Sequence, residues 1–283
     1  MKESIGVIGL GIIGSRAAQN LRAAGYEVAT FNRSPKDDPG FCADAAEVAG
    51  KASAIQIFVR NGDDLLEVVA AMKPALTPAH LILNHATVPP AAAKEAAAMA
   101  AEAGAAFLDC PFTGSKVAAE NGKLAFYAGG DPAAVERARP ILEVNAASIL
   151  PVGDQIGVAS VLKIATNMIS ATTVQILCEA LAVARSQGVS YDLMAEAMKI
   201  NACNSVLAGM KIPQIEAGDY APHFAVKNML KDARFGLALG EEAGLELPAL
   251  AGAAAKLAEA AERGFADEDY CAVAKNFEAL RQG

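Results

Sequence analysis

Cysteine and histidine are scarce in this sequence, and neither is grouped as a metal site or a disulfide framework requires. The five cysteines (Cys42, Cys110, Cys178, Cys203 and Cys271) form no C-x-x-C pair, and their number is odd. A disulfide scaffold is therefore not expected, and a reducing cytoplasm is the default location. The three histidines show no metal-ligand spacing with cysteines or carboxylates. We expect a cytoplasmic protein that holds no metal.

Positive charge and long hydrophobic runs are limited as well. The chain has 24 Lys and Arg against 32 Asp and Glu, a net charge of −8. A nucleic-acid partner usually requires a basic face and is not expected. No uncharged apolar run reaches the roughly 20 residues that span a membrane, and the N-terminus lacks the core of a secretion signal. The 283 residues, 53% of them hydrophobic, suit a soluble globular protein of two domains.

The first half of the chain alternates short strand-like runs with helical segments. We predict strands at 5–9, 27–31, 54–59, 80–83, 107–108 and 124–128, and helices at 13–24 and 91–103. Alternation of this kind indicates a mostly parallel sheet covered by helices.

Strand signals disappear from about Gln155 onward, where helical runs are separated by glycines and prolines. Residues 155–187 contain neither Pro nor an obvious break apart from Gly157 near the start, which permits one helix of about 45 Å at 1.5 Å per residue. Pro151-Val152-Gly153-Asp154 marks the predicted boundary. We expect an α/β domain over 1–153, an all-helical substrate and dimerisation domain over 154–283, and a long interdomain helix joining them.

A glycine-rich loop follows the first predicted strand and opens a helix. It reads Gly9-Leu10-Gly11-Ile12-Ile13-Gly14 and fits the pattern G-x-G-x-x-G. In a dinucleotide site the first glycine permits the tight turn, the second lets the backbone approach the pyrophosphate, and the third allows close helix–strand packing. Glycines also serve ordinary turns, but the strand-then-helix context favours dinucleotide binding.

The end of the second strand bears on which dinucleotide is bound. An NAD site usually places Asp or Glu there to accept from the ribose 2′-hydroxyl, whereas this chain has Asn32-Arg33-Ser34. The Arg33 guanidinium suits a 2′-phosphate, with Asn32 and Ser34 as further donors. The alternative is a solvated loop arginine. The sequence predicts NADP(H) as the preferred cofactor, with NAD(H) as a second one.

The predicted long helix is apolar except for one narrow polar stripe. Ser160, Lys163, Asn167 and Ser170 recur at spacings of three and four, and so share one face. A lysine on such a stripe suits a water-accessible cleft, where its ammonium can protonate a carbonyl oxygen as hydride arrives from nicotinamide. The alternative is a lysine that reaches solvent or pairs with an acid. Asn167, one turn on, could hold a substrate hydroxyl or orient the lysine.

Other dehydrogenase chemistries lack their residues here. No tyrosine is followed four residues later by lysine, which excludes the Tyr-x-x-x-Lys acid of short-chain dehydrogenases. Zinc-dependent alcohol dehydrogenases need Cys and His ligands that the spacing does not offer. A histidine acid of the lactate type would have to be His85 or His223, and neither lies in a recognisable context.

Together these residues resemble the β-hydroxyacid dehydrogenase family over essentially the whole chain. The resemblance rests on the cofactor signature 8–14, on Asp109-Cys110-Pro111-Phe112-Thr113-Gly114-Ser115-Lys116 with its continuation 119–124, on Gly157…Lys163…Asn167, and on 224–232. Within the family, Thr-Gly-Ser-Lys followed by Ala-Glu-Asn-Gly looks closest to the glyoxylate and succinic semialdehyde reductases. These use NADPH, as the Asn32-Arg33-Ser34 segment also indicates.

The resemblance implies a Rossmann domain, a helical C-terminal domain and an active site in the cleft between them. It implies that Lys163 protonates the carbonyl oxygen, with Asn167 as its catalytic partner, and that Thr113, Gly114 and Ser115 hold the substrate carboxylate. The further cofactor contacts that it implies are Arg60, Asn61, Thr87, Phe224 and Lys231. One departure is His85-Ala86-Thr87, because the family commonly has Ser-Thr after the fourth strand.

The leading hypothesis is an NADPH-dependent reductase of small aldehyde or keto acids, with Lys163 as the acid. Oxidation of a 3-hydroxy acid such as 3-hydroxyisobutyrate is the second hypothesis, and a catalytically silent dinucleotide-binding scaffold is the third. We expect side chains near Lys211 and Phe224 to help select the substrate. The apolar C-terminal half predicts a homodimer or homotetramer, which light scattering showing only monomer would reject.

Overall fold

The computed structural model describes residues 2–280 and divides into two compact units, Met1–Lys163 and Ile164–Gly283. The division falls inside one long helix, α7 (Val158–Ser186). The boundary predicted from the sequence, at 153/154, lies in the segment before this helix. The structure divides the chain ten residues later than the sequence analysis did, and so assigns the first turn of α7 to the first unit. Hydrogen bonds to Asp109 join that turn to the first unit.

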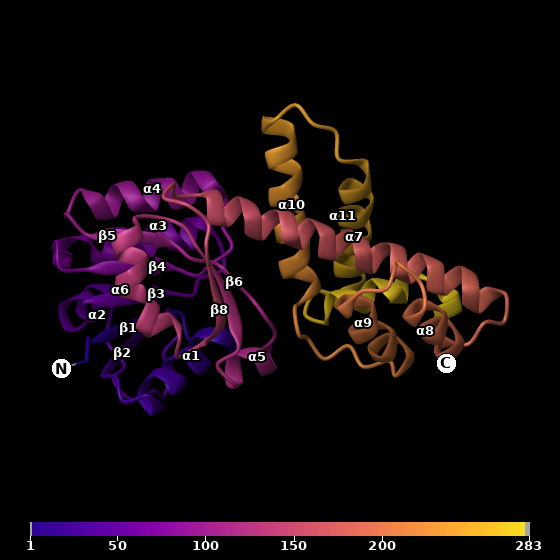
Figure 1. The fold of residues 1–283 in the computed structure, drawn as a ribbon, viewed down its shortest axis with the longest axis horizontal. Helices are drawn as coiled ribbons and strands as arrows, with labels where there is room; N and C mark the ends of the chain where they lie inside the picture. The colour runs from indigo at the N-terminus through magenta and orange to yellow at the C-terminus, as the bar shows by residue number, and fades with distance from the viewer. Residues whose placement is uncertain (1, 281–283) are drawn as a thin grey trace. The chain divides into compact units, whose positions relative to one another are not determined.

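A parallel sheet forms the centre of the first unit (Figure 1). Its strands are β1 (Ile5–Ile8), β2 (Val28–Phe31), β3 (Ala54–Ile57), β4 (Leu81–Asn84) and β5 (Ala106–Asp109). Their order is β2-β1-β3-β4-β5, and all neighbours are parallel. Every residue of β1, β3 and β4 is buried, as expected for a sheet covered on both faces. The predicted α/β architecture is confirmed.

Helices cover both faces of this sheet. The helices of the first unit are α1 (Ile12–Ala23), α2 (Ala45–Lys51), α3 (Gly62–Met72), the 3₁₀ turn η1 (Lys73–Ala75), α4 (Pro90–Ala101), α5 (Lys116–Glu120) and α6 (Pro132–Leu142). Apolar residues of α2, α3 and α4 pack together with one face of the sheet, which includes Ile8. On the other face, Ile5 and Val7 pack with Leu21 of α1 and Ile141 of α6. This alternation along β1 is what buries both faces.

A second, smaller sheet follows β5 in the chain. It consists of β6 (Phe112–Thr113), β7 (Leu124–Ala128) and β8 (Ala146–Pro151), in the order β6-β7-β8. The strand predicted at 124–128 is confirmed as β7. The sequence analysis missed β8, which begins Ala146-Ala147-Ser148 and is mostly exposed, because those residues give no apolar alternation.

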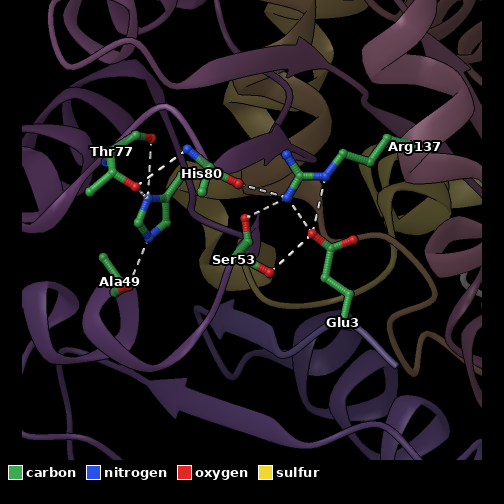
Figure 2. A network of polar contacts seen from close by, with 7 residues as sticks. Glu3, Ala49, Ser53, Thr77, His80 and Arg137 are labelled. Carbon is green, nitrogen blue, oxygen red and sulfur yellow. Dashed lines mark hydrogen bonds and ion pairs between the residues drawn. The ribbon is translucent and has the colours of Figure 1, made fainter. Parts of the chain in front are cut away.

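A polar network joins the segments that precede β1, β3 and β4 (Figure 2). Arg137 of α6 donates to the Glu3 carboxylate and to the carbonyl oxygen of Ala79 at 2.8 Å, and Ser53 Oγ donates to Glu3 at 3.0 Å. His80 Nδ1 accepts from the Thr77 N–H at 2.9 Å, so its Nε2–H donates to the carbonyl of Ala49 at 2.8 Å. These contacts stabilise the amino end of the sheet.

The second unit is helical throughout its described residues, which confirms the predicted all-helical domain. Besides α7 it contains α8 (Tyr191–Lys199), α9 (Val206–Glu216), α10 (Val226–Glu242), α11 (Pro248–Ala260), a π-helical turn η2 (Ala261–Phe265), and the 3₁₀ turns η3 (Tyr270–Asn276) and η4 (Glu278–Leu280). One side of α7, including Val174, Cys178 and Leu181, packs into the core of this unit.

Three apolar side chains of α7 remain exposed at intervals of seven residues: Ile169, Ile176 and Val183. Residues seven apart lie on nearly the same side of a helix. A homo-oligomer would give this stripe a partner, and the homodimer or homotetramer stays a prediction.

Among the described residues, α7 is also the one helix long and apolar enough to cross a membrane, with a mean hydropathy of 1.3. This is weak evidence for a span, because core helices have the same length and composition. In α7, 39% of the apolar window is buried against the rest of the protein.

Candidate active site

Four of the predicted site segments lie at the carboxyl edge of the five-stranded sheet: the glycine loop follows β1, Asn32-Arg33-Ser34 follows β2, Arg60-Asn61 follows β3, and Thr87 follows β4. The fifth, 113–115, begins at the last residue of β6, which comes after β5 in the chain and belongs to the smaller sheet. Because the strands of the larger sheet are parallel, their carboxyl ends share one edge. The strand order reverses direction between β1 and β3, which is where ligands bind in open α/β sheets.

The glycine loop has the shape that a dinucleotide requires. Gly9 has φ +95°, and a Cβ there would lie 2.1 Å from the carbonyl oxygen of Phe58. At Gly14 a Cβ would lie 1.9 Å from the carbonyl oxygen of Gly9, so neither position has room for a side chain. At Gly11 a Cβ would meet nothing within 4 Å. Gly11 is the N-cap residue of α1, and no side chain caps that helix. Open space beside unbonded helix N–H groups fits a pyrophosphate.

Asn32 fixes the end of β2 to this loop. Its Oδ1 accepts the Leu10 N–H at 2.9 Å, and its Nδ2 donates to the carbonyl oxygen of Ser34 at 2.7 Å. One amide therefore holds the glycine loop and the Asn32–Ser34 turn together.

Arg33 and Arg60 converge on Asp64 in the first turn of α3. Arg33 Nη2 donates to Asp64 Oδ1 at 2.8 Å, and Arg60 Nε donates to Asp64 Oδ2 at 2.9 Å. Burial acts to raise the pKa of Asp64, but hydrogen bonds from Arg60 and Arg33 outweigh it and hold that pKa below its ordinary value. Asn61 Oδ1 accepts the Asp64 N–H at 2.8 Å and so caps α3. The two arginines therefore lie beside each other at the carboxyl edge.

Lys163 is buried, with 8% of its surface exposed, so it does not extend into solvent as one alternative supposed. The first turn of its helix is fixed to the carboxyl edge by Asp109, the last residue of β5. Asp109 Oδ2 accepts the Ser160 N–H, and its Oδ1 accepts the Ser160 hydroxyl, both at 2.9 Å. Asn84 donates to the same carboxylate at 3.3 Å. Since Ser160 and Lys163 are three residues apart, they lie on one face of α7.

The charge of Asp109 suits this role. Burial raises its pKa, and hydrogen bonds from Ser160 and Asn84 act in the opposite direction. Each of these partners donates to the carboxylate. The O–H of a protonated carboxyl would need an acceptor, whereas these partners are donors to it, so we assign the ionised form. An anion at the start of α7 also interacts favourably with the helix dipole.

Thr113, Gly114 and Ser115 form the turn between β6 and α5. Thr113 and Gly114 are exposed, and Gly114 has φ +135°, a backbone conformation that favours glycine. Ser115 Oγ accepts the Ala118 N–H at 3.2 Å as the N-cap of α5, and its hydroxyl hydrogen can still be donated. This turn can therefore offer hydroxyl groups to a carboxylate.

His85 does not take over the role of the serine that the family commonly has in this segment. It is 1% exposed and its ring lies between those of Phe58 and Phe126, at centroid distances of 4.6 and 5.0 Å. Its Nδ1 lies 2.7 Å from the Cys110 carbonyl oxygen, and burial lowers its pKa to about 4. A neutral ring that donates from Nδ1 must accept at Nε2. If the Gln56 side-chain amide is flipped by 180°, its Nε2 donates to the Nε2 of His85. In the unflipped orientation the Gln56 Nε2 is buried without a partner. His85 is therefore a core residue and not the catalytic acid.

The buried His85 predicts a pH dependence of stability. Above pH 6.5 the ring is neutral in both the folded and unfolded chains; as pH falls toward 4, the unfolded chain takes up a proton that the folded chain excludes. Stability is lost across that window, by about 3 kcal/mol. Urea unfolding of the wild type and His85→Asn at pH 7, 5.5 and 4 measures this loss. Between pH 7 and pH 4 we expect the free energy of unfolding of the wild type to fall by about 3 kcal/mol more than that of the variant. Equal losses in the two proteins would contradict a buried, neutral His85.

In the second unit, Asn167 lies next to a buried acid. Asn167 Nδ2 donates to Asp232 Oδ2 at 2.6 Å. Lys231 Nζ lies 3.0 Å from Asp232 Oδ1, close enough for an ion pair although the geometry is not that of a hydrogen bond. The Lys231 ammonium also lies 4.9 Å from the ring centre of Phe235. Asp232 thus joins two of the residues that the sequence predicted.

Lys211 itself is buried and bonded, so it is not available to a substrate, and the selection of substrate by side chains near it stays a prediction. It is 2% exposed and donates to Asp269 Oδ1 at 2.7 Å and to Gln214 at 2.8 Å. Asp269 Oδ2 accepts the N–H groups of His223 and Phe224 at 3.0 and 3.2 Å. The buried pair therefore fixes the segment that contains Phe224, a predicted cofactor contact.

A pocket of about 440 Å³ lies elsewhere in the second unit. Its lining includes Tyr191, Tyr220, Arg263 and Lys275. None of the predicted site residues lines it. We place the cofactor at the carboxyl edge of the sheet, where the glycine loop offers a cradle for phosphate. Among residues 2–280, no group of three or more His, Cys, Asp and Glu side chains is arranged to hold a metal ion.

The sequence analysis assigned no role to the acids that hold these residues. Asp64 and Asp232 accept hydrogen bonds from predicted site residues, and Asp109 accepts them from Ser160 of the polar stripe. Asp109 directly precedes the predicted substrate segment and Asp232 directly follows Lys231, a signal that could have drawn attention to both. Asp64 lies four residues after the predicted Arg60, which was a signal for that contact, but its contact with Arg33 joins residues 31 positions apart.

Two family models match the chain one after the other. The model for the NAD binding domain of 6-phosphogluconate dehydrogenase matches residues 4–153. The model described as NAD-binding of NADP-dependent 3-hydroxyisobutyrate dehydrogenase matches residues 157–277. Together they cover both units.

Individual proteins match over nearly the full chain. An L-threonate dehydrogenase of Cupriavidus necator is 29% identical over 99% of this chain and 98% of its own. Glyoxylate/succinic semialdehyde reductase 2, chloroplastic, of Arabidopsis thaliana is 28% identical over 98% of this chain and 80% of its own. The solved structure of Mycobacterium tuberculosis 3-hydroxyisobutyrate dehydrogenase with L-serine has a TM-score of 0.91 and 26% identity, and the match covers 98% of this chain and 100% of that one.

Proposed function

Since this chain belongs to the hydroxyacid dehydrogenase family, we propose that it reduces small aldehyde or keto acids of the glyoxylate or succinic semialdehyde type with NADPH. The family makes it an oxidoreductase that uses a nicotinamide dinucleotide. The substrate class, the direction of the reaction and the preference for NADPH are the proposal.

The observation that carries the proposal is the placement of Lys163. It is a buried lysine on α7, and Asp109 fixes the first turn of that helix to the sheet edge that carries the glycine loop. A scaffold protein has no need to keep an ammonium group in such a place, because burying a charge costs free energy that its partners must offset. This argues against the silent dinucleotide-binding protein.

We assign a separate role in the reduction to each of the predicted site residues. When bound, the nicotinamide supplies the hydride that adds to the carbonyl carbon. Lys163 holds a proton near the carbonyl oxygen and transfers it as negative charge develops there, while Asn167, one turn along α7 and itself held by Asp232, orients the substrate or the lysine. The Thr113–Ser115 turn binds the carboxylate through its hydroxyl and N–H groups.

The preference for NADPH rests on charge at the end of β2. Arg33, which follows β2, and Arg60, which follows the neighbouring segment after β3, bind the same Asp64 carboxylate, and both are largely exposed. A 2′-phosphate carries negative charge and acceptor oxygens that suit two guanidinium groups. A ribose 2′-hydroxyl offers them much less.

The second candidate is oxidation of a 3-hydroxy acid, in which Lys163 would accept the hydroxyl proton. It is favoured by the similarity to a 3-hydroxyisobutyrate dehydrogenase and an L-threonate dehydrogenase. Because the amine must then be neutral, oxidation should favour higher pH than reduction does.

The test is a substrate panel followed by absorbance at 340 nm. Glyoxylate and succinic semialdehyde would be offered with NADPH or NADH, and 3-hydroxyisobutyrate, L-threonate and L-serine with NADP⁺ or NAD⁺. We expect the highest kcat/KM with NADPH and one of the two aldehyde acids. A higher value for any hydroxy acid in the oxidative direction would select the second candidate, and no turnover with any of them would favour a silent protein. The cytoplasmic location stays a prediction.

A further inference from the structure

Arg33 contacts two acids that differ in burial. Asp64 lies 2.8 Å from Arg33 Nη2 and its side chain is 12% exposed; Glu67, one turn along α3, lies 2.7 Å from the same nitrogen and is 68% exposed. Two carboxylates therefore share one guanidinium nitrogen.

Asp64 is held in place from several sides. Its backbone N–H donates to the Asn61 side chain, and its carboxylate accepts hydrogen bonds from Arg60 at 2.9 Å and from Arg33. The side chains of Arg33 and Arg60 are 58% and 74% exposed, so both remain accessible to a ligand while they are bonded to Asp64. A buried acid with two exposed arginines is suited to preorganise an anion site, because little side-chain freedom remains to be lost on binding.

Glu67 has a different relation to Arg33. No contact joins it to Arg60 among the described interactions, and it lies on the exposed side of α3. Exposed ion pairs such as this one contribute little to stability, because water and salt screen them. A phosphate oxygen that approaches Arg33 Nη2 would compete with this carboxylate for the nitrogen and would also meet its negative charge.

We propose that Asp64 positions Arg33 and Arg60 for the 2′-phosphate of NADP(H), while Glu67 competes with that phosphate for Arg33, so that these two acids set the selectivity between the two dinucleotides. The inference rests on the proposed function and adds the residues that determine its cofactor preference. It gives the two acids opposite effects, although both contact the same arginine.

Dissociation constants for NADP⁺ and NAD⁺, measured by isothermal titration calorimetry on the full chain without substrate, test this. In Glu67→Gln we expect NADP⁺ to bind about two- to fivefold more tightly, the equivalent of one exposed ion pair. In Asp64→Asn we expect NADP⁺ to bind on the order of tenfold more weakly, as the loss of a charge-assisted contact implies. NAD⁺ binding should change little in either variant.

Asp63→Asn is the matched control, because Asp63 is exposed on the same helix and loses the same charge. An equal gain in NADP⁺ affinity in Asp63→Asn and Glu67→Gln would overturn competition at Arg33. An equal loss of NADP⁺ and NAD⁺ affinity in Asp64→Asn, measured on protein with wild-type circular dichroism, would overturn the positioning role. If that variant does not fold, the Glu67→Gln result still decides whether the acids act on the phosphate.

Failure of the proposed function has a separate signature. Wild-type protein that binds NAD⁺ as tightly as NADP⁺, with neither affinity altered by Arg33→Ala, would reject the NADPH preference itself. Wild-type protein that prefers NADP⁺, with no response to Asp64→Asn or Glu67→Gln, would reject only the roles given to the two acids.

Discussion

A Lys163→Ala variant is expected to lose about 10²- to 10⁴-fold in kcat/KM for carbonyl reduction, the range that a positioned general acid contributes. The dissociation constant for NADPH should stay within about twofold of the wild-type value, because the glycine loop, Arg33 and Arg60 are unchanged. The loss would be measured with the best aldehyde acid of the substrate panel, and NADPH binding by fluorescence titration.

Two further variants separate the possible roles of this lysine. Lys163→Arg keeps a positive charge, but guanidinium does not give up its proton at neutral pH, so activity should stay low. An active Lys163→Arg protein would mean that charge suffices and that no proton is transferred from this residue. Lys51→Ala removes an exposed lysine of the same unit that belongs to no predicted site segment, and it should leave kcat/KM unchanged.

The largest loss of stability is expected from breaking the buried pair of Lys211 and Asp269. Replacing Lys211 by Met leaves the Asp269 carboxylate, 0% exposed, without its ammonium partner. An uncompensated buried charge of this kind costs about 3–5 kcal/mol. Burial acts to raise the pKa of Asp269, but the hydrogen bond and the charge of Lys211 outweigh it and keep that pKa below its ordinary value. Urea unfolding at pH 7, followed by circular dichroism, would measure the loss.

A double variant and an exposed pair complete this experiment. Lys211→Met with Asp269→Asn removes both charges, so it should recover part of the stability lost in Lys211→Met alone. The exposed pair of Lys227 and Asp267 provides the control, and Lys227→Met should change stability by less than about 1 kcal/mol. Equal losses in Lys211→Met and Lys227→Met would show that burial does not set the strength of these pairs.

Sequence alone was sufficient for the fold and the cofactor loop. The strand before Gly9, β1, is wholly apolar, and the alternation of strand and helix signals along the chain predicted a parallel sheet. The spacing of Gly9, Gly11 and Gly14 predicted the turn between β1 and α1. The resemblance to the hydroxyacid dehydrogenases is confirmed by both family models. These features depend on local pattern, which a sequence displays directly.

The contacts that hold the site could not be predicted, because they join residues distant in the chain. Asp109 and Ser160 are 51 positions apart, and nothing near either one indicates the other. His85 shows the same limit: its neighbours do not reveal that Phe58 and Phe126 enclose its ring. A side chain's environment comes from the whole fold, so its charge state and its role do too.

The hydrogen bonds between Asp109 and Ser160 at the start of α7 also limit where the chain could be cut into two folding fragments. A fragment that ends at residue 153 would lack Ser160, leaving the Asp109 carboxylate without two of its donors, and would lack Lys163 itself. A fragment that extends through α7 would take Val174, Cys178 and Leu181 out of the other unit's core. Neither of these two cuts leaves both fragments with all of their contacts. Recombination that exchanges one half for a foreign module would therefore have to bring a compatible helix with it.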